Sequence, residues 1–259
     1  MFRTLQFIVV VVILALISTA HGRISFSPRE QKIEEKMIPM RDGVELHTVI
    51  MMPHGWREGH PKMSTLMDRS PYGFSNMEWF SDFTLPFGFA GVGQDIRGTE
   101  LSYGNYSMWQ SETNDSRDLG DWIISQPWSD GKIFTVGASA DGLASLQTYK
   151  TKPAWLQGQY VIWAPVNPYD ILLPAGAYKQ KTVVDWLSGL TRTYDPDTLP
   201  DNLQTIRENE AHTPYWGEIT EADDFFATVD YPSGFFAGWY DLFLPGTLEG
   251  FEGYQYRAK

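Results

Sequence analysis

Residues 133–149 constrain the fold most strongly, because a strand, a sharp turn and a helix follow one another there without a spacer. The β-branched and aromatic run at 133–136 predicts a buried strand, and residues 143–149 have helix-forming character. Between them lies Gly137-Ala138-Ser139-Ala140-Asp141-Gly142. A serine on such a turn needs small neighbours, because the strand and the helix pass each other closely. The sequence therefore predicts a nucleophile elbow with Ser139 at its apex.

The alternative for this segment is a glycine-containing turn that carries an ordinary surface serine. The spacing is Gly-x-Ser-x-x-Gly, whereas the commoner elbow is Gly-x-Ser-x-Gly. The strand before the serine, the helix after it and the four small flanking residues favour the elbow.

Composition limits the class of protein. The 259 residues are 42% hydrophobic and 15% aromatic, which is enough apolar material for a large core. A net charge of −12 opposes binding to nucleic acid, so no nucleic-acid partner is expected. The chain has no cysteine, and its fold therefore relies on its core rather than on disulfides.

The N-terminus has the pattern of a secretory signal peptide. Arg3 supplies a positive charge, residues 5–17 are almost entirely apolar, and small residues allow cleavage after Ala20 or Gly22. The apolar stretch is shorter than the roughly 20 residues that span a bilayer, so cleavage is favoured over an uncleaved signal anchor. We assign residues 1–22 to the signal and expect a secreted chain without a stable membrane span.

Two sequons are consistent with a secretory route. Asn105 and Asn114 each begin an Asn-x-Ser triplet in a polar stretch, and both are candidate glycosylation sites. Such triplets also occur by chance.

The remaining sequence alternates strands with helices. A hairpin is expected around Arg41-Asp42-Gly43, followed by strands at 64–69, 92–96, 133–136 and 160–164 and a helix at 115–126. This alternation favours a mostly parallel sheet with helices on both faces. We assign residues 31–164 to an α/β core, 165–231 to an inserted helical cap, and 232–259 to the return of the core, with a strand at 233–239 and a helix at 244–257.

A candidate acid for a catalytic triad follows the strand at 233–239. Ser139 and Asp241 stand in the chain order that α/β-hydrolases use for nucleophile and acid. A carboxylate at Asp241 would orient an imidazole and stabilise its charged form. Capping of the next helix is the alternative role of Asp241. Only His212 follows Ser139, and a structural or surface role is favoured for it over that of the base.

A second set of residues concerns the oxyanion hole. Tyr72 lies in a loop directly after a strand, and the backbone N–H of Ala140 follows the nucleophile. Donors at these two places would stabilise charge on a carbonyl oxygen, although packing against Pro71 is the alternative role for Tyr72. Asp95 and Arg97 are expected to form a structural ion pair. The sequence carries no dinucleotide or calcium motif, so no cofactor or metal is expected.

Taken together, these motifs resemble the Xaa-Pro dipeptidyl-peptidase and cocaine esterase family of α/β-hydrolases. The resemblance rests on the elbow and on the segments at 40–46, 69–73, 94–98, 125–132 and 238–241, in this order. It implies an α/β-hydrolase fold with a helical cap, Ser139 as nucleophile, Asp241 as triad acid, and Tyr72 with the Ala140 amide as oxyanion donors. It also implies that an ester or short peptide substrate is cleaved through an acyl-enzyme, without a cofactor.

The sequence departs from the family pattern at two places. Ala140 replaces the usual tyrosine after the serine. Family members usually continue after Asp241 into a strand, the catalytic histidine and a jelly-roll domain, so we expect this chain to be the N-terminal, truncated part of such a hydrolase. The alternative is a secreted, non-catalytic binding protein derived from the same fold.

Overall fold

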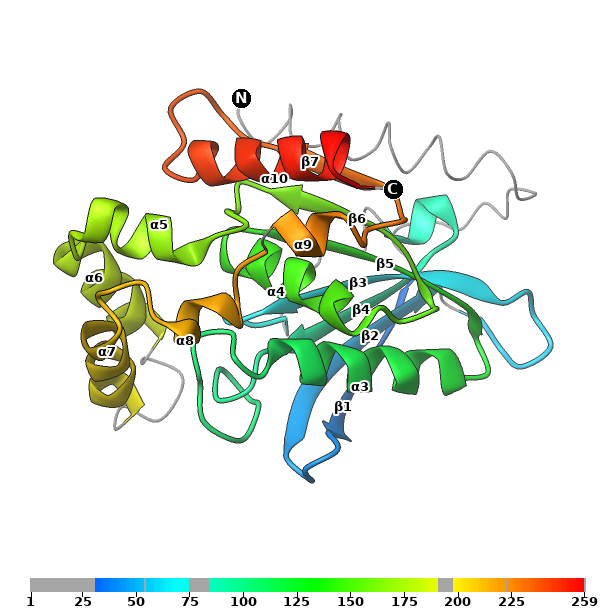
Figure 1. Cartoon of the computed structure of the whole chain (residues 1–259). Coiled ribbons are helices and arrows are strands. Elements are labelled where there is room, and N and C mark those ends of the chain that lie inside the picture. Colours follow the sequence, from blue (N-terminus) through cyan, green and yellow to red (C-terminus); the bar gives the residue numbers. More distant parts are fainter. Residues whose placement is uncertain (1–30, 54, 75–83, 191–197, 222, 259) are drawn as a thin grey trace.

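The computed structural model describes residues 31–53, 55–74, 84–190, 198–221 and 223–258. Its centre is a seven-stranded sheet in the order β1-β2-β4-β3-β5-β6-β7 (Figure 1). β2 runs antiparallel to β1 and to β4, and the other neighbouring strands are parallel. The strands are β1 Gln31–Pro39, β2 Glu45–Pro53, β3 Met63–Ser70, β4 Ala90–Asp95, β5 Ser129–Ala138, β6 Leu156–Ile162 and β7 Ser233–Phe236. The predicted mostly parallel α/β sheet is confirmed.

Within the described ranges, the helices that pack against this sheet are α3 Glu112–Ser125, α4 Ala140–Thr148 and α10 Leu244–Tyr256. In α4, Ser145 Oγ donates to Thr135 Oγ1 at 2.7 Å, and Gln159 Nε2 donates to Tyr254 Oη of α10 at 2.9 Å. Because Thr135 and Gln159 are register partners in β5 and β6, α4 and α10 cover the same face of the sheet.

The opposite face of the sheet carries a separate apolar cluster built on Val49, Met51, Leu66, Phe74 and Val136. The 3-10 helix η1 Leu85–Phe87 precedes β4 in the chain. Residues 75–83, before η1, lie outside the described residues.

Between β6 and β7 the chain forms short helices and turns. α5 to α8 lie beyond one end of the sheet, and α9 lies close to α10 (Figure 1). In α6, the buried residues Val183, Leu187 and Leu190 recur at helical spacing and give it one apolar face. These elements are α5 Pro168–Leu172, η3 Pro174–Gly176, α6 Gln180–Leu190, α7 Thr198–Glu208, α8 Pro214–Gly217 and α9 Asp223–Phe226, and a further 3-10 turn, η2 Tyr149–Thr151, follows α4.

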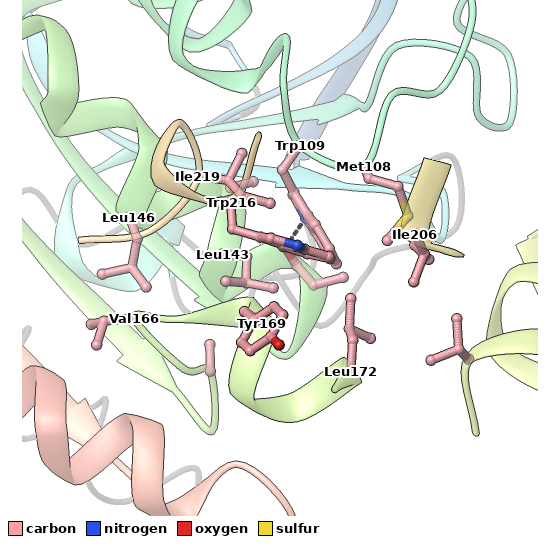
Figure 2. Close-up of a cluster of buried hydrophobic side chains, with 14 of the residues drawn as sticks. Met108, Trp109, Leu143, Leu146, Val166, Tyr169, Leu172, Ile206, Trp216 and Ile219 are labelled. Atoms are coloured by element: carbon pink, nitrogen blue, oxygen red, sulfur yellow. Dashed lines mark hydrogen bonds between the residues drawn. The ribbon is translucent and has the colours of Figure 1, made fainter. Parts of the chain in front are cut away.

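The largest core cluster joins α4 to these short helices. Leu143 and Leu146 of α4 face Trp109, Trp216 and the other labelled apolar side chains in Figure 2. Trp216 and Ile206 are almost completely buried. Residues that are more than 60 positions apart in the sequence therefore form one apolar core around the start of α4.

A buried ionic network ties β3 to α3. The Arg69 guanidinium donates to Glu112 and Ser116 of α3, and its Nε donates to Gln94 Oε1 in β4 at 2.8 Å. Arg69 is 2% exposed and Glu112 is 0% exposed. The ion pair therefore fixes the helix on the sheet from inside the protein.

The expected ion pair between Asp95 and Arg97 is wrong. Arg97 instead binds Asp115 in a bidentate arrangement at 2.7 and 2.9 Å and reaches Asp42 at 2.8 Å. Asp95 Oδ2 forms a hydrogen bond with His47 Nδ1 at 2.8 Å. The reason is strand order, because β4 lies beside β2, which carries His47.

Candidate active site

Ser139 lies on a sharp turn between β5 and α4, as the sequence predicts. Its backbone has φ 59° and ψ −121°, a combination that is strained for a residue with a Cβ. The turn is fixed on both sides, because Ser139 N donates to Ile162 O at 3.0 Å and Leu143 N donates to Ser139 O at 3.1 Å. The strained serine therefore stands at the carboxyl end of a central strand, where open α/β sheets place their ligands.

The small neighbours of Ser139 are required by close backbone contact. A Cβ on Gly137 would lie 2.3 Å from the carbonyl carbon and oxygen of Asp141. A Cβ on Gly142 would lie 2.5 Å from the Cβ of Ala164. Both distances are far below van der Waals contact, so the turn closes only with glycine at these two positions.

Replacing Ser139 with glycine is expected to stabilise the protein by about 1 kcal/mol. Release of the positive-φ strain gains about 1–3 kcal/mol, and the extra backbone entropy of glycine in the unfolded chain offsets about 0.5–1 kcal/mol. Ser139→Ala is the matched control, because it removes the hydroxyl but keeps the Cβ and the strain. Urea unfolding measures both variants, and equal stabilities would contradict the strain argument.

The Tyr72 hydroxyl lies beside Ser139. It accepts from Trp186 Nε1 of α6 at 3.0 Å. Although 47% of Tyr72 is exposed, burial of its hydroxyl raises the pKa of the phenol, and the hydrogen bonds with Trp186 and Ser139 act in the opposite direction. The phenol is therefore protonated at neutral pH and available as a donor.

Ala140 is the first residue of α4. The first backbone N–H groups of a helix have no intrahelical acceptor, so the Ala140 amide is available to a developing negative charge next to Ser139. The carbonyl of Ala140 is held by Trp109 Nε1, which donates to it at 3.2 Å.

A small apolar pocket of about 80 Å³ opens at Ser139. Trp109 and Trp186 form part of its wall and stack on each other with ring centroids 5.4 Å apart and planes 9° apart. The other lining residues include Leu143, Leu172 and Phe243. A larger cavity of about 280 Å³ between β7 and α10 has no residue of the elbow in its lining. The elbow therefore opens onto the smaller pocket and not onto the larger one.

Asp241 lies in the loop between β7 and α10. Its backbone N–H donates to Gly238 O at 3.0 Å, and its Oδ1 accepts from Phe243 N at 2.7 Å. α10 begins at Leu244 with Phe243 as its N-cap, so the Asp241 carboxylate binds the backbone directly before the helix and does not occupy the N-cap itself. The next two residues, Leu242 and Phe243, line the pocket at Ser139. The fold therefore brings the Asp241 loop to the same pocket as the elbow.

The histidines that the structure describes contact residues other than Ser139 and Asp241. His212 is exposed and packs edge-on against Tyr169 with ring centroids 4.8 Å apart. His47 is buried between Asp95 and Glu35. Within the described ranges no histidine lines the Ser139 pocket, and no three metal-binding side chains converge.

Both sequon asparagines lie on the surface. Asn105 is exposed in the loop after β4, and Asn114 is exposed in the first turn of α3, where its Oδ1 accepts from Arg41 at 3.0 Å. The predicted signal peptide, residues 1–22, lies outside the described residues. None of the helices in the described ranges is long and apolar enough to cross a membrane.

Sequence reasoning missed three side chains that meet at the elbow. Trp186 Nε1 donates to the Tyr72 hydroxyl, and Ser70 Oγ accepts from Tyr72 N at 3.1 Å. Burial raises the pKa of Asp141, and the Ser70 side chain acts in the opposite direction. Asp68 lies behind them in β3 and is 3% exposed. The adjacent charges Asp68 and Arg69 near the end of the strand Met63–Ser70 were the signal that could have indicated a site there.

Comparison with known proteins identifies the family of the chain. The chain matches the X-Pro dipeptidyl-peptidase (S15 family) model over residues 42–201. Cocaine esterase from a Rhodococcus strain is 33% identical over 158 residues, which are 58% of this chain and 27% of the relative. A putative serine esterase from Mycobacterium bovis is 38% identical over 60 residues, which are 22% of this chain and 10% of the relative.

Solved structures share the fold. A CocE/NonD family hydrolase from Staphylococcus aureus superimposes with a TM-score of 0.72 at 19% identity, over 92% of this chain and 50% of that one. An alpha-amino acid ester hydrolase gives a TM-score of 0.67 at 19% identity, over 90% of this chain and 48% of that one. The chain thus spans about half the length of these structures. Since the family model covers more than half of the sequence, the chain belongs to the X-Pro dipeptidyl-peptidase (S15) family.

Proposed function

We propose that the chain is the N-terminal part of a secreted serine hydrolase that cleaves ester or amide bonds through an acyl-enzyme on Ser139. The observation that carries the proposal is the strained Ser139 backbone beside the Tyr72 hydroxyl and the start of α4. Family membership supports a hydrolase of this type, and the matched relatives include esterases.

In the proposed reaction, Ser139 Oγ attacks the substrate carbonyl carbon. The serine proton passes to an imidazole that the described residues do not supply and that Asp241 orients. The carbonyl oxygen becomes an oxyanion, which the Tyr72 hydroxyl and the Ala140 N–H stabilise. The imidazolium then protonates the leaving alcohol or amine, and water releases the acyl group by the same steps.

The pocket favours a small apolar acyl group. Its lining from Trp109, Trp186, Leu172 and neighbouring apolar residues provides no charged side chain. A volume of about 80 Å³ suits a short or single-ring acyl chain. Esters and short peptides both present such groups, so both remain substrates under the proposal.

The test is covalent labelling of Ser139 by a fluorophosphonate probe, read by mass spectrometry. The complete protein encoded with its downstream sequence is expected to label at Ser139. The chain ending at Lys259 is expected to label at least about 10³-fold more slowly, because removal of one triad member costs several powers of ten. Ser139→Ala controls for labelling elsewhere. Absence of labelling in both forms would reject the enzyme and favour a binding protein.

Secretion is part of the proposal. It is supported by the apolar run at residues 5–17 and by the exposed Asn105 sequon. N-terminal sequencing of the protein from a eukaryotic host checks it, and a product that still begins at Met1 would contradict it.

A further inference from the structure

Two buried carboxyl groups lie beneath the elbow. Asp68 of β3 is 3% exposed and Asp141 in the first turn of α4 is 8% exposed. One oxygen of each, Oδ1, has no hydrogen-bond partner among the described residues. Buried carboxylate oxygens without donors are costly, whereas a protonated carboxyl carries its own donor.

Ser70 connects Asp141 of this pair to the loop that carries the oxyanion donor. Burial raises the pKa of the Asp141 carboxyl, and the Ser70 side chain acts in the opposite direction. Ser70 Oγ accepts from the backbone N–H of Tyr72 at 3.1 Å. Ser70 O accepts from Ile96 N at 2.9 Å. The loop that carries Tyr72 is therefore held between β4 and the first turn of α4.

The charges around the pair do not neutralise it. Arg69 is adjacent in β3, but its guanidinium binds Glu112 and Gln94. Among the described residues, the Tyr72 phenol also interacts electrostatically with Asp141. Burial raises the pKa of Asp141 to about 8, and burial together with the charge of Asp141 raises the pKa of Asp68 well above its ordinary value.

We propose that Asp68 and Asp141 hold at least one proton between them at neutral pH and that this protonated pair positions Ser70 and the Tyr72 loop for the reaction at Ser139. This inference rests on the function proposed above. Loss of the proton places a negative charge next to the developing oxyanion and weakens its stabilisation. Asp68, Asp141 and Ser70 are thus positioning residues that act through Tyr72.

The first experiment measures the proton itself. Urea unfolding is followed from pH 4 to 9 for the wild type, for the double variant Asp68→Asn/Asp141→Asn, and for the exposed control Asp185→Asn. A carboxyl whose folded pKa is raised stabilises the protein below its unfolded pKa and loses this contribution as the pH rises through the folded pKa. Between about pH 4 and 8, the folding equilibrium constant of the wild type is therefore expected to fall, relative to the double variant, by up to about tenfold per pH unit.

A flat ratio between wild type and double variant across this range would overturn the inference. If the double variant does not fold, infrared spectroscopy of the wild type replaces the comparison. A carboxyl C=O stretch that shifts on ¹³C labelling of aspartate is expected at neutral pH, and its absence would equally overturn the inference.

The second experiment measures positioning at Ser139. The wild-type rate of fluorophosphonate labelling is expected to fall at least about tenfold, relative to the double variant, as the pH rises from 7 to 9. Ser70→Ala is expected to slow labelling about tenfold while keeping the pH dependence of unfolding. Identical pH profiles would overturn the positioning role. Absence of labelling at every pH would instead reject the proposed function. The unfolding experiment would still show whether Asp68 and Asp141 hold a proton at neutral pH.

Discussion

Replacing Gly137 with alanine is expected to destabilise the protein by about 3 kcal/mol or more, at the upper end of what overpacking costs. The new Cβ would lie 2.3 Å from the carbonyl carbon and oxygen of Asp141 and 2.6 Å from Gly142 N. All three are backbone atoms of the first turn of α4, so no side-chain rotation relieves the clash. The helix has to move away from the end of β5, and Ser139 moves with it. Thermal and urea unfolding measure the loss of stability.

Gly189→Ala is the matched control for this experiment. Gly189 lies in helix α6, and a Cβ there meets no atom within 4 Å. Alanine is favoured over glycine in a helix by about 1 kcal/mol, so this variant is expected to be more stable than the wild type. Opposite signs for the two substitutions follow from backbone contact at Gly137 alone. A Gly137→Ala protein with wild-type stability would contradict the close backbone contact at Gly137.

Replacing Arg69 with methionine is expected to cost about 3–5 kcal/mol, because it leaves a buried carboxylate without its main partner. Glu112 is 0% exposed, and burial already raises its pKa to about 7 against the opposing charge of Arg69. Without Arg69 its pKa rises further. The cost is therefore expected to be greatest above pH 7 and to shrink as acid neutralises Glu112. Unfolding measured at pH 5 and pH 8 checks both the size and the sign.

Two further variants isolate the buried pair. Arg69→Met/Glu112→Gln removes both charges and is expected to recover most of the lost stability. Arg117→Met removes the exposed partner of Asp121 in the same helix, where the pair is 2.8 Å long, and is expected to cost at most about 0.5 kcal/mol. An Arg69→Met variant that is no less stable at pH 8 than at pH 5 would contradict the charge argument.

Much of the fold could be predicted because its signals are local. The alternation around residues 41–43 predicts the hairpin of β1 and β2, and the apolar spacing at 115–126 predicts α3 within a few residues. Helix ends were less accurate, since α3 begins at Glu112, three residues before the predicted start at Asp115. Where a helix begins and ends depends on its packing against other elements, and the sequence of the segment alone does not contain that information.

The candidate site divides in the same way. Ser139 and Ala140 follow from one continuous motif, and Tyr72 and Asp241 from their places after strands. The Trp186–Tyr72 hydrogen bond joins residues 114 positions apart, and nothing in either segment indicates it. The expected Asp95–Arg97 pair is wrong for the same reason, because Asp95 binds His47 in β2 and Arg97 binds Asp115 in α3.

The sequence by itself determined the strained serine turn, since backbone strain and the need for small neighbours are properties of six consecutive residues. The tertiary structure decided what surrounds that turn. β3 lies between β4 and β5, and this strand order places Asp68 and Ser70 next to the first turn of α4. The pKa of a buried carboxyl group depends on the residues around it, because desolvation and charge pairing are set by distance in space rather than in the chain.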